Sequence, residues 1–227
     1  MKNLQVVFLA MSVLFTACGQ EQNEKVETTI DKAEEVLGPI GLNSFLSDRK
    51  DLSDKVDSVF NSLSDESKVA QLIMPAAGRL GHSEERIKYL IDNNYIGGIL
   101  LLNGTKQQFT DWVVEYNERV EKLGQLPFLY SADAEPSLVN RKIIGSKTVK
   151  KANLITSEEE VIEVTKSISN DLNDIGINYN FSPVVDQAKN KTVGYRGFGT
   201  KPENIVPYSD AFIPVSYTHL TLPTSTH

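Results

Sequence analysis

Short apolar runs alternate with amphipathic helical patterns along most of the chain, and this alternation restricts the possible folds more than any other feature. Three apolar runs have the length and composition of buried strands: 96–103, 126–133 and 177–186. Apolar residues recur at helical spacing in four other segments: 51–73, 83–91, 106–122 and 157–175. Helices that alternate with buried strands are typical of βα units around a parallel sheet. The sequence therefore predicts an α/β fold.

Several helix ends can be placed from single residues. Ser64 and Ser157 each precede acidic residues, as a capping serine at a helix start does, and Ser83 stands before Glu84-Glu85. Gly176 is expected to stop the last of these helices, because glycine readily takes the left-handed conformation at a helix end.

Composition and charge exclude several classes of protein. The 227 residues include 23 Lys plus Arg against 30 Asp plus Glu, which gives a net charge of −7. An acidic chain without a basic stripe is a poor candidate for nucleic-acid binding. One cysteine allows neither an intramolecular disulfide nor a cysteine-based zinc site, and no metal-ligand spacing is visible. We expect no metal and no organic cofactor.

The first residues are typical of a secretion signal. Segment 1–17 has a cationic start, a short apolar run and a small-residue exit, and the run is too short to span a membrane stably. Cys18 follows at once, and Phe15-Thr-Ala-Cys18-Gly resembles a bacterial lipobox, in which the cysteine is lipidated. The alternative is an ordinary cleaved signal. We expect a lipid anchor at Cys18, a flexible acidic tether over 18–45, and a periplasmic or surface-exposed place in a bacterial cell envelope.

Two predicted strands end in a carboxylate, Asp133 and Asp186. Polar residues at the carboxyl ends of parallel strands build the sites of barrels and of open α/β sheets. The sequence contains neither a glycine-rich phosphate loop nor a Gly-x-Ser-x-Gly elbow, which argues against nucleotide binding and serine hydrolysis.

The strand ends also carry a family resemblance. Segment 133–141, DAEPSLVNR, resembles the Asp-x-Glu-Gly-Gly-x-Val-x-Arg motif of glycoside hydrolase family 3. Segment 176–186, GINYNFSPVVD, is similar to that family's Gly-Ile-Asn-x-Asn-Phe-Ala-Pro-Val-x-Asp, and 195–199, YRGFG, resembles its Arg-Ser-Phe-Gly turn. Segments 67–73 and 96–99 match its opening helix and second strand. The resemblance implies that 46–214 forms the first half of a (β/α)8 barrel of the TIM type.

The resemblance also implies roles for individual residues. Asp133 would bind sugar hydroxyls in the −1 subsite, and Arg141 and Arg196 would line the same pocket. The alternative for Asp133 and Arg196 is a mutual or capping salt bridge. Glu135 and Asp186 are expected either to hold the sugar-binding residues in place without touching the sugar, or to stabilise the fold only. Two departures leave the sugar specificity open: Pro136-Ser137 replaces the Gly-Gly pair, and Gly197 replaces Ser.

The catalytic residues of the family have no counterpart in the sequence. Family members use an Asp nucleophile on a later strand and a separate acid/base, which we expect beyond this segment. Ser209-Asp210 lies in a helical stretch too early in the fold to supply the nucleophile. Segment 215–227 resembles the translated end of a sequencing-library adapter, with a Thr-rich strand as the alternative. We expect the 227-residue polypeptide by itself to be inactive and poorly soluble or molten, because a half barrel leaves open sheet edges.

These expectations define three candidate functions. The first is a retaining exo-glycosidase that hydrolyses terminal β-linked sugars, with β-N-acetylhexosaminidase preferred. The second is a β-glucosidase with the same barrel. The third is a catalytically silent carbohydrate-binding lipoprotein that uses Asp133 and Arg196. The expected partners are a glycan ending in N-acetylglucosamine or glucose and a membrane reached through the anchor, with no nucleic acid.

Overall fold

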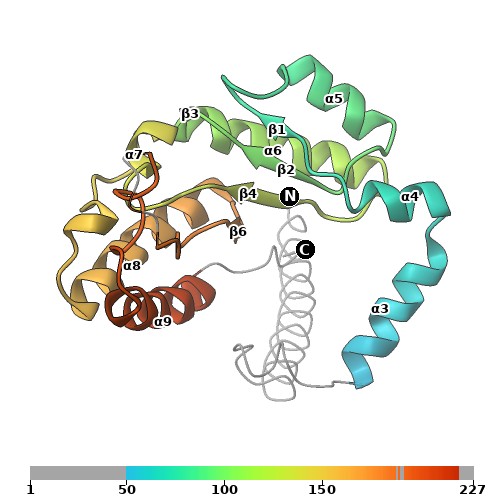
Figure 1. The fold of residues 1–227 in the computed structure, drawn as a ribbon. Helices are drawn as coiled ribbons and strands as arrows, with labels where there is room; N and C mark the ends of the chain where they lie inside the picture. Colours follow the sequence, from blue (N-terminus) through green and yellow to red (C-terminus); the bar gives the residue numbers. More distant parts are fainter. Residues whose placement is uncertain (1–49, 188, 190–191, 220–227) are drawn as a thin grey trace, which may run out of the picture. The chain divides into compact units, whose positions relative to one another are not determined.

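A parallel sheet forms the centre of the described chain (Figure 1). The computed structural model describes residues 50–187, 189 and 192–219. The predicted signal, Cys18, the tether and residues 220–227 lie outside the described residues. The four-stranded sheet has the order β1 (Ala76–Ala77), β2 (Gly98–Leu101), β4 (Leu129–Ala132) and β6 (Tyr179–Asn180). All three neighbouring pairs are parallel, and the strands follow one another in space as they do in the sequence. This arrangement confirms the predicted α/β fold.

One long helix lies in each connection between neighbouring strands, as expected for βα units. These helices are α5 (Glu84–Asp92), α6 (Lys106–Lys122) and α8 (Glu158–Ile175). Their starts follow from capping: the side chains of Ser83, Thr105 and Ser157 each accept a hydrogen bond from a backbone N–H in the first turn. Gly176 ends α8 with φ 91°, the left-handed conformation predicted for it.

Two further helices precede the sheet, and one follows it. The predicted helical segment 51–73 is divided at Ser64 into α3 (Lys50–Ser62) and α4 (Asp65–Ala70), and Ser64 caps the second of these. Helix α9 (Pro202–His219) packs against α8 and contains Ser209-Asp210, as predicted. It continues through His219, so no end of secondary structure marks the boundary predicted at 214, and residues 215–219 form no strand. None of the helices in the described part of the chain combines the length and the hydropathy of a membrane-spanning segment.

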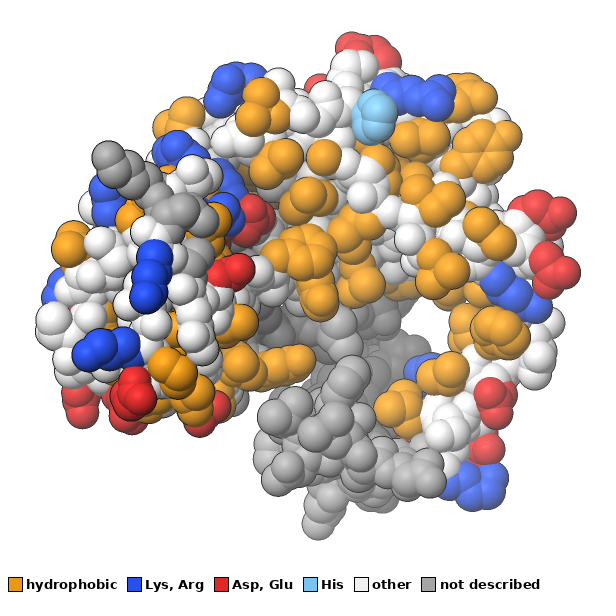
Figure 2. Space-filling model, viewed as in Figure 1, with side chains coloured by type: hydrophobic (Ala, Val, Ile, Leu, Met, Phe, Trp, Pro, Cys, Tyr) orange, Lys and Arg blue, Asp and Glu red, His pale blue; other side chains and the backbone are white. Residues whose placement is uncertain are grey.

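The sheet buries one face and leaves parts of the other exposed. Ile99, Leu101 and Tyr130 are at most 2% exposed, and the Tyr130 hydroxyl donates a hydrogen bond to Asn117 of α6. Residues one position away point to the opposite face, where Leu129 and Tyr179 are 42% and 47% exposed. Figure 2 shows hydrophobic side chains gathered on the face of the molecule turned toward the viewer. Such exposed strand faces are what a half barrel leaves uncovered.

Short elements between residues 133 and 157 were not predicted. They are α7 (Val139–Lys142), β5 (Ile143–Ile144) and the 3₁₀ helix η1 (Ala152–Leu154). Strand β5 pairs in parallel with β3 (Gly104–Thr105), which directly precedes α6. Strand β1 was missed as well, because Ala76–Ala77 is too short to show a periodic pattern between Pro75 and Gly78.

The predicted strand 177–186 is too long, and placing Asp186 at a strand tip is wrong. Strand β6 ends at Asn180, and Asp186 lies six residues further on in an exposed irregular segment. Pro183 interrupts the run because it has no N–H to donate to a sheet ladder. Among the described residues, moreover, no strand pairs with the free side of β6.

Candidate functional site

The candidate site begins where β4 ends. Asp133 follows Ala132 directly, so its predicted place at a strand tip is confirmed. Two asparagine side chains, one just before β6 and one in it, hold the backbone of β4 and of the residues that follow it. Asn178 Oδ1 accepts a hydrogen bond from the Tyr130 N–H at 3.0 Å, and Asn180 Oδ1 accepts one from the Ala134 N–H at 3.0 Å. The backbone around Asp133 is therefore fixed by side chains from the neighbouring strand.

Glu135 is the buried centre of the site. It is 0% exposed, and Arg196 binds it with both arms of its guanidinium: Nε donates to Oε2 at 2.8 Å and Nη2 donates to Oε1. These hydrogen bonds raise the pKa of Arg196 above its ordinary value, because they favour the charged form more strongly than burial disfavours it. The pair joins two segments 61 residues apart in the sequence.

Lys142 completes the group, and sequence reasoning missed it. Its Nζ donates a hydrogen bond to Asp133 Oδ2 and lies 3.7 Å from Glu135 Oε1. Only 12% of its side chain is exposed. The signal in the sequence was a lysine on a short segment between two apolar residues, Val139 and Ile143, which are both buried in the structure. We call Asp133, Glu135, Lys142 and Arg196 the strand-end cluster.

The structure brings Asp133 and Arg196 together but does not pair them directly. Each is held by a different partner, Lys142 for Asp133 and Glu135 for Arg196. The charge of Asp133 nevertheless contributes to the raised pKa of Arg196, so the two side chains lie within electrostatic reach. The alternative of a direct mutual salt bridge is therefore replaced by a chain of four alternating charges.

Arg141 and Asp186 lie apart from this cluster. Arg141 is exposed and lines a separate hollow with Pro136, Lys151 and Tyr195. Its neighbour Lys142 contacts Asp133 instead. Asp186 is exposed, and its backbone carbonyl lies near Gly197 rather than beside the carboxylates.

The two departures from the family motif are built into the packing. The Ser137 hydroxyl donates to the Tyr195 carbonyl at 2.8 Å and accepts from the Ala152 N–H at 3.0 Å, so it ties the loop after Asp133 to two other segments. A Cβ atom at Gly197 would lie 3.0 Å from the Val184 carbonyl oxygen. A serine at position 197 would therefore require that carbonyl to move.

The strand-end cluster can bind hydroxyl groups. Asp133 and Arg196 keep 30% and 28% of their side chains exposed, whereas Glu135 is closed off from solvent. A carboxylate oxygen accepts hydrogen bonds from vicinal hydroxyls, and a guanidinium donates them in a fixed fork. In the part of the chain that the structure describes, no group of three or more His, Cys, Asp or Glu side chains could hold a metal ion.

Comparison with known proteins defines the class first by its fold. A β-N-acetylglucosaminidase of glycoside hydrolase family 3 from Paenibacillus sp. str. FPU-7 superposes with a TM-score of 0.59 at 24% identity, over 68% of this chain and 31% of its own. A β-glucoside phosphorylase, BglX, superposes with a TM-score of 0.65 at 16% identity, over 83% of this chain and 34% of its own. The described chain thus has the fold of part of a TIM-type barrel domain.

The sequence then identifies the family. The model of the glycosyl hydrolase family 3 N-terminal domain matches residues 64–220, and the chain belongs to this family. It is 28% identical over 157 residues to the beta-hexosaminidase LpqI of Mycobacterium tuberculosis, which covers 66% of this chain and 39% of that protein. The chain therefore spans about two fifths of the length of this curated relative.

Proposed function

We propose that the whole protein is a retaining exo-glycosidase that removes terminal β-linked sugars, with a preference for N-acetylhexosamine. The observation that carries this proposal is the partly exposed Asp133 at the end of β4, held by Lys142 next to Arg196, which a buried glutamate binds, in a chain of glycoside hydrolase family 3. Rigid acceptors and donors of this kind can bind a flattened, positively charged sugar ring more tightly than the resting ring, and that difference accelerates glycoside cleavage.

The strand-end cluster supplies binding rather than bond cleavage. Glu135 is buried and hydrogen-bonded to Arg196, and Asp133 accepts a hydrogen bond from Lys142. Neither carboxylate is therefore a free nucleophile in the described structure. We therefore assign the nucleophile and the acid/base to residues outside 1–214. The 227-residue polypeptide alone is then expected to bind sugar weakly and to hydrolyse none.

The preference for N-acetylhexosamine draws on the named activities of relatives. LpqI is named a beta-hexosaminidase, and the Paenibacillus structure is named a β-N-acetylglucosaminidase. A β-glucosidase is the second candidate, since the β-glucoside phosphorylase has the same fold. The third candidate is a silent carbohydrate-binding lipoprotein, which would use the same open atoms of Asp133 and Arg196 without a nucleophile elsewhere.

We also propose a place and a domain order for the protein. Residues 1–17 would be a lipoprotein signal, Cys18 the lipidated residue and 18–45 the tether, with the family 3 barrel beginning near 46 and a foreign tail over 215–227. Labelling cells with a radioactive fatty acid tests the anchor: the wild-type protein incorporates label, and Cys18→Ser does not. Sequencing the source gene across codon 214 tests the tail.

Hydrolysis by the full-length gene product tests the function. The expected result is release of p-nitrophenol from p-nitrophenyl N-acetyl-β-D-glucosaminide with a kcat/KM at least tenfold above that for the β-D-glucoside. The reverse ratio would favour the β-glucosidase. Sugar binding without release from either compound would leave the silent lipoprotein as the function.

A further inference from the structure

Lys142 is an unusually buried cation on a surface element. It ends the four-residue helix α7, yet only 12% of its side chain is exposed. An ammonium group that loses most of its water is unfavourable unless carboxylates replace that water. Here Asp133 and Glu135 do so, one by a direct hydrogen bond and the other across 3.7 Å.

The backbone under Lys142 is fixed from both sides. The Val139 N–H donates to the Glu135 carbonyl at 2.8 Å, and the Lys142 N–H donates to the Leu138 carbonyl at 3.1 Å. The next residue, Ile143, is 1% exposed and pairs with Gly104 of β3. The ammonium group is thus held by the fold at a set position relative to Asp133.

This position decides which atoms of the cluster stay open. Lys142 engages Asp133 Oδ2, while Oδ1 has no hydrogen-bond partner among the described residues. Glu135 engages Nε and Nη2 of Arg196, and a guanidinium has five N–H donors, so Nη1 still has donors to offer. Among the described residues, one acceptor of Asp133 and three N–H donors of Arg196, two of them on Nη1, therefore remain for a ligand.

We propose that Lys142 is a positioning residue of the sugar-binding site. It holds Asp133 through Oδ2 so that Oδ1 meets the sugar hydroxyls, and it balances the second negative charge of the Asp133–Glu135 pair so that Arg196 keeps free donors. The inference rests on the proposed sugar-binding role of Asp133. It goes beyond the family motif, which ends at Arg141 and gives no role to the next position.

A double-mutant cycle in the full-length protein tests this inference. Lys142→Met lowers kcat about 10- to 100-fold, with KM changed less than about threefold, because a misplaced carboxylate loses contacts that strengthen in the transition state. Lys142→Arg restores activity to within about fivefold of the wild type. In a protein that already carries Asp133→Asn, Lys142→Met costs less than about twofold, since its effect acts through Asp133.

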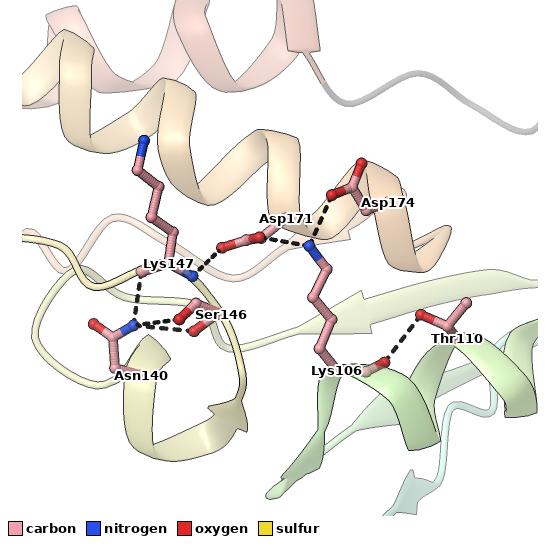
Figure 3. A network of polar contacts seen from close by, with 7 residues as sticks. All are labelled: Lys106, Thr110, Asn140, Ser146, Lys147, Asp171 and Asp174. Carbon is pink, nitrogen blue, oxygen red and sulfur yellow. Dashed lines mark hydrogen bonds and ion pairs between the residues drawn. The ribbon is translucent and has the colours of Figure 1, made fainter.

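Lys147→Met is the matched control, with the same charge change five residues along the chain. Its side chain is exposed and points away from Asn140 and Ser146 (Figure 3), and activity stays within twofold of the wild type. An equal loss from Lys142→Met with and without Asp133→Asn would show a purely structural role and overturn the proposal. If Lys142→Met does not fold, Lys142→Gln, which keeps a donor, enters the same cycle.

The design separates this inference from the proposed function. If the wild type binds N-acetylglucosamine or glucose without hydrolysing any glycoside, the glycosidase proposal fails. The double-mutant cycle is then measured as the Kd of the sugar for each variant, by calorimetry. The Kd then rises at least fivefold for Lys142→Met in the wild type and less than twofold in the Asp133→Asn protein. A wild type that binds neither sugar overturns both proposals.

Discussion

Lys106 and Lys142 each face two carboxylates, but the two groups differ in what they leave open. Lys106 Nζ donates to Asp171 Oδ1 at 2.6 Å and to Asp174 Oδ2 at 2.7 Å, and the Lys147 N–H donates to Asp171 Oδ2 at 2.6 Å (Figure 3). Both oxygens of Asp171 are therefore used. Beside Lys142, Asp133 has one oxygen used and one open among the described residues.

Exposure follows the same division. The Asp171 side chain is 11% exposed, and the Asp133 side chain is 30% exposed. Burial lowers the pKa of Lys106, but the hydrogen bonds to Asp171 and Asp174 together with their negative charges outweigh it and raise the pKa. Lys106, Asp171 and Asp174 thus connect the start of α6 to the last turns of α8. The Lys147 N–H adds the segment that begins at residue 147. A saturated charged group of this kind stabilises the fold, whereas an unsaturated group at a strand end is able to bind a ligand.

The largest effect is expected from Glu135→Gln, which neutralises the buried centre of the strand-end cluster. Arg196 and Lys142 would then share one carboxylate, and breaking a buried ion pair costs about 3–5 kcal/mol of the free energy of unfolding. Urea unfolding of the full-length protein measures this. Glu158→Gln, the same change at an exposed position in the first turn of α8, is the control and costs less than about 0.5 kcal/mol. A loss below 1 kcal/mol for Glu135→Gln would mean that the pair is not a structural centre.

Asp133→Asn separates binding from stability. The amide keeps an acceptor for Lys142, so the free energy of unfolding changes by less than about 1 kcal/mol. The charged acceptor for sugar is lost, and kcat/KM falls about 100-fold, which corresponds to about 2.7 kcal/mol. Asp210→Asn in α9 is the control and leaves kcat/KM within twofold, because that residue lies in an exposed helical position. Equal losses for the two variants would argue against a sugar contact at Asp133.

The sequence could predict what is decided locally. Ser64, Ser83 and Ser157 start helices by accepting a backbone hydrogen bond, Gly176 ends one through its left-handed conformation, and these positions are confirmed. The apolar run before Asp133 is long enough to place that residue at a strand tip. Asp186 was misplaced because the strand was predicted to run through Pro183, and because the sequence does not show that, among the described residues, no strand pairs with the free side of β6.

The partners within the site could not be predicted, because they are decided by contacts between distant segments. Glu135 meets Arg196 across 61 residues, and Lys142 reaches Asp133 because α7 turns directly after Glu135. A helix of four residues has no periodicity from which to detect it. The motif resemblance found three of the four members of the cluster, and geometry was needed for the fourth.

Asp171→Ala tests the other side of the comparison. It removes an acceptor from Lys106 and from the Lys147 N–H, and we expect a loss of about 2 kcal/mol in the free energy of unfolding. The kcat/KM of the full-length protein stays within twofold, since this group contacts no open atom of the strand-end cluster. Asp174→Ala, whose side chain is 66% exposed, costs less than about 0.5 kcal/mol. A specific loss of sugar turnover in Asp171→Ala would contradict the division between the two groups.

A third lysine, Lys88, extends the comparison to the surface and gives the smallest effect. Its Nζ lies 2.6 Å from Glu84 Oε1 and 2.6 Å from Glu115 Oε1, and the two glutamate side chains are 39% and 40% exposed. The hydrogen bond from Lys88, followed by that from Trp112, lowers the pKa of Glu84. A carboxyl group whose pKa is lowered by folding stabilises the folded state above its unfolded pKa of about 4.3, and this contribution is lost as the pH falls through the folded value.

Glu84→Gln is therefore expected to matter at pH 7 and not at pH 3. At pH 7 it lowers the free energy of unfolding by less than about 1 kcal/mol, because solvent screens an exposed pair. The amide oxygen still accepts from the Trp112 N–H, so packing is retained. Urea unfolding at the two pH values measures the difference between variant and wild type. A difference that stays constant with pH would show that shape, not charge, sets the contribution of Glu84, and the Lys88 group would then no longer belong in a comparison of ion pairs.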